Sequence, residues 1–460
     1  MMTQAAELER AIYAALNGAP DSVEAQTFVD RLTNGLVSHE WQTTGRVNER
    51  GQKNRDKLAV VVGGFMFDLL VATGRPETEG WVYRPMRTES FSDVGVSIKT
   101  FRPMVRMMAE LGYVEPHEEN AISSSVKTKA ARWRATDKLL RIAAFRGITP
   151  ANVHDHFHQR LPERPLVLRA PSRRDQKDKV RGKRIAFRQT PQTEAIEYDL
   201  KRFNVFLDGF EIDGGNHRGY TRIFNNGSSD GYSWDKGGRL YSLCHDSYQS
   251  MSKEARSLMT IDGDAVAEID VRASYLTVLH GLSGKPFDVA EDAYDLEGLL
   301  PMPLGKELTR WAVKKWAVVV LGHGKHMTRW PDEAVEEFKS ATGLVLGRVY
   351  PIREIRRAME LKHPIFKEWG SLGLSWAELM FHESEAMLGA MLELMDSDGI
   401  PSLTVHDSLI VRESDVEQAQ ETLRRSYRKA CGIEPFLVVK PKELTAPKGV
   451  GPLSTLSVYH

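Results

Sequence analysis

The chain has 460 residues, 41% hydrophobic and 27% charged, a composition that predicts a globular protein with two or three domains. Its 62 Lys and Arg balance 62 Asp and Glu, which excludes a uniformly basic nucleic-acid-binding protein and leaves only local basic patches. The two cysteines, Cys244 and Cys431, exclude a disulfide scaffold or zinc module, so we expect a reducing, cytoplasmic location. Because no run of 18 apolar residues is present, we expect no membrane partner.

Residues 1–165 are expected to form a helical domain. Apolar residues at helical spacing predict a helix over 97–111, and a short strand, a polar loop and a returning strand over 131–136 follow. A further helix is expected from Asp137. This order resembles a winged helix-turn-helix, with 97–111 as the recognition helix and 112–134 as the wing.

The winged-helix resemblance implies contact with DNA through exposed cations of the helix and the wing. A winged helix used for protein contacts, or an ordinary helical domain with solvated cations, would show the same charges. The candidate DNA-binding residues are Lys99, Arg102, Arg106, Lys127, Lys129, Arg132 and Arg134.

Residues 166–190 are expected to be a basic linker or arm. Within them, the stretch 169–188 holds nine Lys and Arg against two Asp, and Pro171 and Gly182 favour an exposed chain. Phosphate binding and simple solvation both remain open interpretations of this charge.

An aspartate stands inside an apolar stretch, "LTVHDSLIV" (403–411), which predicts a buried strand or hairpin. A buried carboxylate is costly unless it is paired or bound to a metal, so Asp407 requires an explanation. Asp270 ends another apolar strand. Two aspartates on neighbouring strand ends can hold two divalent ions for in-line displacement at phosphorus, although each could instead be a capping or ion-paired residue.

A helix between these aspartates carries Arg310 and Lys314, four residues apart and therefore on one face. Two cations on one face are suited to a triphosphate, although basic residues on a surface helix are also common.

The ordered set of segments resembles the palm and fingers of family A DNA polymerases and single-subunit phage-type RNA polymerases. The segments are "GGRLYS" (237–242), "MTIDGDAVAEID" (259–270), "RWAVK" (310–314) and "VHDSL" (405–409), and the resemblance covers about 235–440.

The resemblance implies an α+β fold, in which a winged-helix module is followed by a compact right-hand polymerase core with an antiparallel palm sheet and helical fingers. The core would occupy residues 191–460, with the palm at 235–285 and 375–445 and reduced fingers at 286–374.

The family's site residues transfer as follows. Asp270, Asp407 and the carbonyl of Val271 would hold two Mg²⁺ ions, with Mn²⁺ as an alternative. Nucleotide binding would fall to Arg310, Lys314, Tyr275 and Val318, and primer-template binding to Arg239, Gln249 and His406.

Departures from the family leave the choice of sugar open. Tyr275 replaces the Glu of the DNA enzymes and the Gly of the RNA enzymes, and its bulk favours deoxynucleotides. Val318, Gly322 and Ser408 instead favour ribonucleotides. We therefore predict a DNA polymerase that extends a primer-template with dNTPs, recruited to DNA by the winged helix among the replication proteins of a mobile element. A primase or RNA polymerase that uses rNTPs, and a non-catalytic replication initiator with a degenerate core, are the alternatives.

Overall fold

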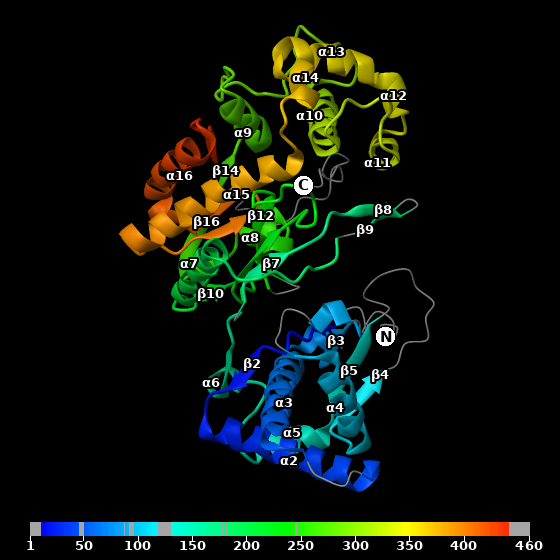
Figure 1. Cartoon of the computed structure of the whole chain (residues 1–460), viewed down its shortest axis with the longest axis vertical. Helices are drawn as coiled ribbons and strands as arrows, with labels where there is room; N and C mark the ends of the chain where they lie inside the picture. The colour runs from blue at the N-terminus through cyan, green and yellow to red at the C-terminus, as the bar shows by residue number, and fades with distance from the viewer. Residues whose placement is uncertain are drawn as a thin grey trace. The chain divides into compact units, whose positions relative to one another are not determined.

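The computed structural model describes residues 11–45, 50–86, 88–91, 96–117, 130–162, 164–175, 178–180, 182–243 and 247–440. The chain divides into two compact units. The first comprises Met1–Pro165 with Asn216–Thr221 and Ser242–Met251. The second comprises Leu166–Gly215, Arg222–Tyr241 and Ser252–His460. Figure 1 shows both units and labels many of their elements.

The elements of the first unit are β1 (Ile12–Tyr13), β2 (Gly18–Pro20), α2 (Val23–Thr44), α3 (Gln52–Thr73), β3 (Trp81–Arg84), α4 (Ile98–Glu110), β4 (Val114–His117), β5 (Ala131–Ala135), α5 (Asp137–Ala144), α6 (Val153–His156) and β6 (Phe157–Gln159). Four of the strands form a sheet in the order β1-β3-β5-β4, and β2 pairs with β6.

The core of the first unit is built around α3, whose residues Val61–Ala72 are buried without interruption. A helix that is apolar on all sides must be surrounded by other elements, and here α2 and α4 pack against it. The rings of Phe65, Phe101 and Trp133 meet edge to face, with centroids 5.3–5.7 Å apart, and join α3 and α4 to β5.

The helix and the two strands expected for the winged-helix pattern are present as α4, β4 and β5, and α5 begins at Asp137 as predicted. Lys99, Arg102 and Arg106 are exposed on α4. Arg132, expected on an exposed wing, is buried instead and donates to the carbonyl of Ala130.

The other wing candidates have different outcomes. Arg134 is half-buried and forms an ion pair with Glu115 at 2.7 Å while its guanidinium stacks on Trp81. Lys127 and Lys129 lie outside the described residues.

The elements of the second unit are β7 (Leu166–Leu168), β8 (Arg173–Asp175), β9 (Asp178–Val180), α7 (Pro191–Leu207), β10 (Ile212–Asp213), β11 (Tyr220–Phe224), β12 (Gly237–Ser242), α8 (Lys253–Arg256), β13 (Thr260–Ile261), β14 (Asp264–Val271), α9 (Ser274–Ser283), α10 (Lys306–His323), α11 (Asp332–Thr342), α12 (Leu346–Val349), α13 (Ile352–Lys362), α14 (Ile365–Glu368), α15 (Trp376–Glu393), β15 (Leu403–Val405), β16 (Ser408–Arg412), α16 (Val416–Cys431) and β17 (Leu437–Lys440). The first residues of β11 and the last of β12 fall in the first unit.

The main sheet of the second unit has the order β10-β13-β14-β16-β15, with β17 also paired to β14. All of its pairings are antiparallel. Along β14, Ala267, Ile269 and Val271 are buried and alternate with the half-buried Glu268 and Asp270. Because successive side chains of a strand point to opposite faces, this alternation places both acids on one face of the sheet.

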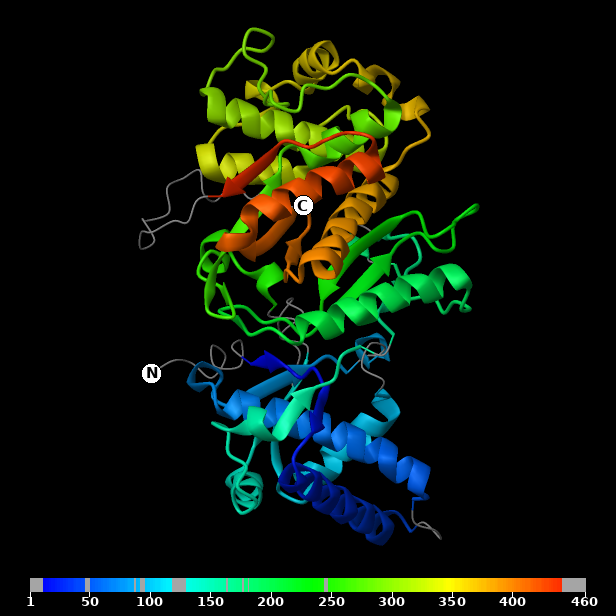
Figure 2. The ribbon, with the colours of Figure 1, turned by 90° about the vertical axis from the view of Figure 1, so that its left-hand side faces the viewer.

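Two long helices, α15 and α16, lie side by side near this sheet, as Figures 1 and 2 both show. Five helices, α10 to α14, gather at one end of the second unit (Figure 1). These are the segments expected to form the fingers.

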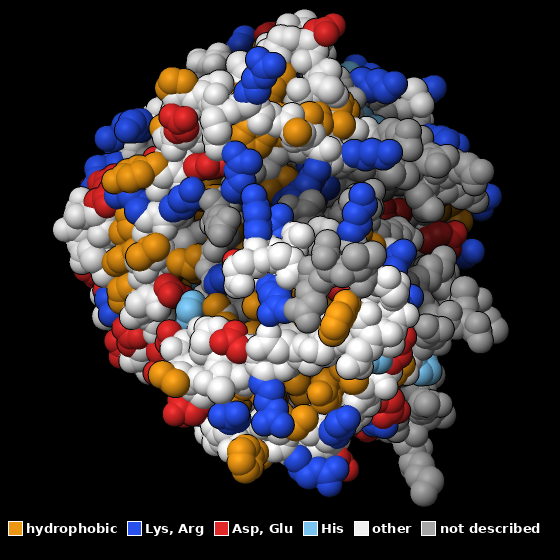
Figure 3. Space-filling model, turned by 60° about the horizontal axis from the view of Figure 1, so that its bottom comes forward, with side chains coloured by type: hydrophobic (Ala, Val, Ile, Leu, Met, Phe, Trp, Pro, Cys, Tyr) orange, Lys and Arg blue, Asp and Glu red, His pale blue; other side chains and the backbone are white. Residues whose placement is uncertain are grey.

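The segment expected to be a linker contributes to the second unit. Its β7 pairs in parallel with β11, and Arg169 and Arg184 form an isolated bridge beside it. Figure 3 shows one face of the molecule, on which both basic and acidic side chains are exposed. Among the residues that the structure describes, no helix is long and apolar enough to cross a membrane.

Candidate active site

The apolar stretch 403–411, which contains Asp407, forms a β-hairpin. Its two strands, β15 and β16, are joined by the two-residue turn His406-Asp407, with Val405 paired to Ser408. His406 has φ 58°, a left-handed conformation that is uncommon outside glycine and is concentrated at functional sites.

The register of the sheet brings Asp407 and Asp270 together. Asp270 pairs with Ser408, the residue after Asp407, and the amide of Val271 donates to the carbonyl of Asp407 at 3.2 Å. Two carboxylates 137 positions apart in sequence are thus neighbours, Asp270 in β14 and Asp407 in the turn before β16.

The Asp407 carboxyl is in an environment that penalises its charge. Burial, together with the nearby carboxylates of Glu383 and Asp270, raises its pKa to about 7, and the Arg239 guanidinium only partly opposes this shift. Within the described residues, the Asp407 side chain forms no ion pair. The site therefore carries negative charge that a bound cation would neutralise.

One carboxylate oxygen of Asp270 is fixed by hydrogen bonds. Its Oδ1 accepts hydrogen bonds from the hydroxyl of Ser408 at 2.6 Å and from Nζ of Lys440 at 3.0 Å. Lys440 also pairs with Glu268, which Arg256 contacts in turn. This chain of ion pairs fixes Oδ1 of Asp270.

A buried carboxylate, Glu383 of α15, organises the other side of the site. It is 0% exposed and accepts hydrogen bonds from Nη2 of Arg239 at 2.6 Å and from the Ser274 hydroxyl at 2.7 Å. The same Arg239 donates to the hydroxyl of Tyr275 at 2.8 Å, and its Nη1 lies 3.1 Å from Nδ1 of His406. Burial lowers the pKa of Arg239, but the Glu383 carboxylate more than offsets this and leaves the pKa raised.

Glycine allows this close approach of β12 to α15. Gly238 has φ 82°, and a Cβ there would lie 2.9 Å from Oγ of Ser384. A larger residue would force the strand and helix apart and would separate Arg239 from Glu383.

The basic residues of α10 have different environments. Arg310 forms an ion pair with Asp292, Nε to Oδ2 at 2.5 Å, and stacks on Tyr294. Burial lowers the pKa of Lys314, although Asp407 and Asp270 are close enough to oppose this. Val318 follows one turn later on the helix and is half-buried.

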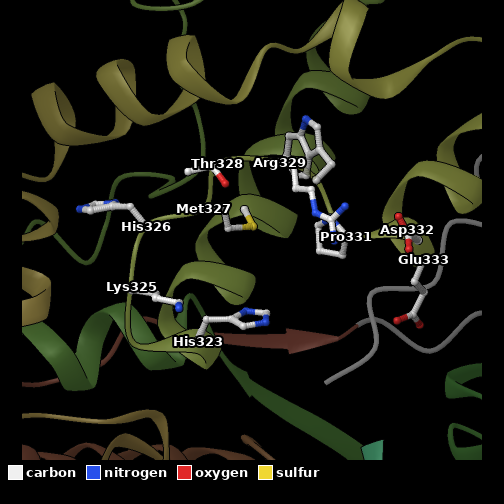
Figure 4. Close-up of a pocket in the computed structure, with 10 residues that line it drawn as sticks. His323, Lys325, His326, Met327, Thr328, Arg329, Pro331, Asp332 and Glu333 are labelled. Carbon is white, nitrogen blue, oxygen red and sulfur yellow. The ribbon is translucent and has the colours of Figure 1, made fainter. Parts of the chain in front are cut away.

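Two cavities lie near the end of α10. One, of about 470 Å³, is lined by residues that include Tyr241, Gly322, His323 and Trp376. A second, of about 680 Å³, is drawn in Figure 4, where His323 and Lys325 lie at one side and Asp332 and Glu333 at another. No residue predicted for the site lines the second cavity, so its size does not make it the candidate site.

The structure brings together most of the residues that the sequence suggested for catalysis. These are Arg239, Asp270, Val271, Tyr275, Lys314, His406 and Asp407, all in the second unit. Gln249 belongs to the first unit, where its side-chain oxygen accepts from the amide of Ser242 at 2.9 Å.

Sequence reasoning missed Glu383, Trp376 and Lys440. A signal for Glu383 was present, because it lies on the apolar stripe of α15 between Leu379 and Met387, where an unpaired acid would not be tolerated. No local pattern marked Lys440, since its role arises from the pairing of β17 with β14.

No protein-family model matches the chain, and no curated protein matches it. A solved structure of the polymerase domain of Pol1 from M. smegmatis, in complex with DNA primer-template and dNTP, is 15% identical to it. The match covers 44% of this chain and 45% of that one, with a TM-score of 0.27. The similarity to a DNA polymerase domain is therefore weak, and the chain spans less than half of that domain.

The protein side chains at the site supply only some of the ligands that a hard divalent cation such as Mg²⁺ requires. Among the described residues, no group of three or more His, Cys, Asp and Glu side chains is placed to hold a metal. Mg²⁺ nevertheless commonly binds through one or two carboxylates, with substrate phosphates and water completing its shell. The raised pKa of Asp407, which lies beside Asp270 and Glu383, fits that mode of binding.

Proposed function

We propose that the second unit is a template-directed nucleotidyltransferase, a DNA polymerase that extends a 3′-hydroxyl with dNTPs. One observation carries the proposal. Asp407, in the turn before β16, lies beside Asp270 of the adjacent β14, Asp407 has no ion pair within the described residues, and Lys314 is close to both. Buried carboxylates with a purely structural role are normally paired with a cationic side chain, so this arrangement favours a site that binds a metal cation and an anionic substrate.

Asp270, Asp407 and the carbonyl of Val271 would hold the divalent cations, Mg²⁺ or Mn²⁺. When bound, these ions would activate the attacking hydroxyl and stabilise charge on the leaving group. In the reaction, the 3′-oxygen forms a bond to the α-phosphorus, the bond from that phosphorus to the bridging oxygen breaks, and pyrophosphate leaves. The hydroxyl proton passes to water.

The chain's cations would orient the triphosphate. Lys314 is already near the aspartates, and its charge would be stabilised by a polyphosphate. Arg310 pairs with Asp292, so a triphosphate must compete with that carboxylate for the guanidinium. Val318, one turn beyond Lys314, would contact the nucleotide from the same helix.

The remaining residues would hold the primer-template and read the sugar. Arg239 and His406 meet beside the aspartates, which suits contact with the primer end. Tyr275 would crowd a 2′-hydroxyl and so favour dNTPs. Gln249 retains its proposed role at the primer-template. The exposed α4 cations would recruit the enzyme to duplex DNA in a winged-helix manner, among the replication proteins of a mobile element.

A primer-extension assay tests this proposal. The full chain is incubated with Mg²⁺, then Mn²⁺, on DNA and RNA templates, with dNTPs and rNTPs offered separately, with and without a primer. The Asp407→Asn variant is run beside Asp264→Asn, a matched change at an exposed position of the same sheet. We expect template-dependent dNTP incorporation that Asp407→Asn abolishes and Asp264→Asn retains.

Other outcomes identify the alternatives. Ribonucleotide products without a primer would show a primase or RNA polymerase and would overturn the assignment of the sugar. No product in any condition, together with tight DNA binding, would replace the enzyme with a non-catalytic initiator.

A further inference from the structure

One face of α15 carries two side chains that point to the same neighbour. Trp376 and Glu383 are seven residues apart, about two turns, and therefore lie on the same side of the helix. Trp376 contacts Tyr275 directly, and Glu383 reaches it through Arg239.

The start of α15 is well fixed. Ser375 and Glu378 form a capping box, in which the amide of Ser375 donates to the Glu378 carboxylate at 2.6 Å. Because Trp376 is the first residue of the helix, this cap sets the position of its backbone. Its indole then lies against the Tyr275 ring, with centroids 3.7 Å apart.

The other end of the Tyr275 side chain is held as firmly. Its hydroxyl accepts from Arg239, and the Arg239 guanidinium is clamped by Glu383 through both Nε and Nη2. The neighbouring Ser274 donates to the same Glu383 carboxylate. Tyr275 is thus fixed at its ring, at its hydroxyl and through the residue before it.

The contact between Trp376 and Tyr275 lies beside a cavity, because Trp376 is one of the residues that line it. Trp376 lines the cavity of about 470 Å³ together with Tyr241 of β12 and Gly322 at the end of α10. That cavity is large enough for a nucleoside and is bounded by the helix that carries Lys314 and Arg310.

We propose that Trp376 is a specificity-determining residue, which holds Tyr275 in place so that nucleotides with a 2′-hydroxyl are rejected. Glu383 is a positioning residue for the same Tyr275, acting through Arg239. This inference rests on the proposed polymerase function. The physical reason is that a freely rotating Tyr275 side chain could move aside for the 2′-hydroxyl of a ribonucleotide at little cost in free energy. A tyrosine whose ring contacts Trp376 and whose hydroxyl is hydrogen-bonded to Arg239 must break those contacts before it can move.

The test measures the ratio of kcat/KM for dNTP to kcat/KM for rNTP in the full-length enzyme. Trp376→Ala is expected to lower this ratio by roughly tenfold or more, since pocket contacts of this size typically change selectivity by ~10-fold to 200-fold. Trp376→Phe, which keeps an aromatic ring, is expected to restore most of the discrimination.

Two controls separate selectivity from loss of structure. Tyr198→Ala removes an aromatic ring that is 67% exposed on α7 of the same unit, and it should leave the ratio unchanged. Glu393→Gln changes an acid at the far end of α15 that pairs with Arg425, and it should also have no effect. Thermal unfolding of each variant reports whether the fold is kept.

The outcomes are distinct for the inference and for the function on which it rests. If the wild type extends primers and Trp376→Ala keeps both its fold and its ratio, the inference is overturned and the polymerase stands. If the wild type extends no primer under any condition, the proposed function fails and the inference fails with it.

Discussion

Each unit of the molecule contains an aspartate whose pKa is raised by burial, and the two differ in their partners. Asp68 lies within α3 of the first unit, where burial raises its pKa to about 6. The amide of Leu16 donates to its carboxylate at 2.7 Å, and Arg218 and Arg84 oppose the shift. The pKa of Asp407 is raised to about 7 by burial and by the carboxylates of Glu383 and Asp270.

Under the proposed function, Asp68 is a structural acid and Asp407 a functional one. Asp68 accepts a backbone hydrogen bond from Leu16, whose φ of 59° is itself unusual, so it supports a strained turn of the chain. Asp407 lies near the carboxylates of Glu383 and Asp270, and their like charge disfavours its ionised form although Arg239 opposes this. Such a cost is typical of sites where a ligand supplies the missing charge.

The largest expected difference between the two acids is in activity. Asp407→Asn should lower kcat in primer extension by roughly 10³-fold, because metal-based charge stabilisation contributes several kcal/mol and each 1.4 kcal/mol is about tenfold. Asp68→Asn should leave kcat near the wild-type value. Comparable losses in both variants would contradict the distinction.

The second difference is in pH-dependent stability. Because the pKa of Asp68 is higher in the folded state than its ordinary 3.8, its favourable contribution is present below about pH 4 and lost as pH rises through 6. A shift of this size corresponds to about 3 kcal/mol. Asp68→Asn should therefore gain stability relative to the wild type as pH rises from about 4 to about 6, and keep that gain above pH 6, measured by urea unfolding. Asp56→Asn, on the exposed side of the same helix, is the matched control and should show no such gain.

The third difference is in the response to divalent cations. Mg²⁺ or Mn²⁺ at about 100 times Kd should stabilise the wild type by about 2.7 kcal/mol, seen as a higher midpoint of thermal unfolding. Asp68→Asn should retain this shift and Asp407→Asn should lose it. Without added metal, Asp407→Asn should be more stable than the wild type, because one of three neighbouring carboxylates loses its charge. An undiminished metal response in Asp407→Asn would place the cation elsewhere.

The smallest effects are expected at the surface of the first unit. Each of Lys99→Ala, Arg102→Ala and Arg106→Ala should weaken DNA binding and reduce its slope with log salt concentration by about 1, because each removes one phosphate contact. Lys53→Ala, an exposed cation of α3, is the control. Equal slopes for all variants would remove α4 from the DNA-binding surface.

The sequence by itself determined the local elements and the residues with chemical potential. Helical spacing and terminal glycine predicted α4, and the apolar run around Asp407 predicted the β15–β16 hairpin, because both signals arise within about fifteen residues. The pair of acids and the cations on α10 were also visible as residue types with a shared chemistry. The exposure of Arg132 was mispredicted, since alternation along β5 does not by itself say which face is covered.

Only the tertiary structure decided how these residues meet. The register of β14 against β16 set Asp270 beside Asp407, and the pairing of β17 with β14 brought Lys440 to Asp270. Because β12 packs close to α15, Glu383 accepts hydrogen bonds from Arg239 and Ser274. Arg239 in turn donates to the hydroxyl of Tyr275. Most of these contacts join residues more than a hundred positions apart, so their geometry depends on packing that no local pattern encodes.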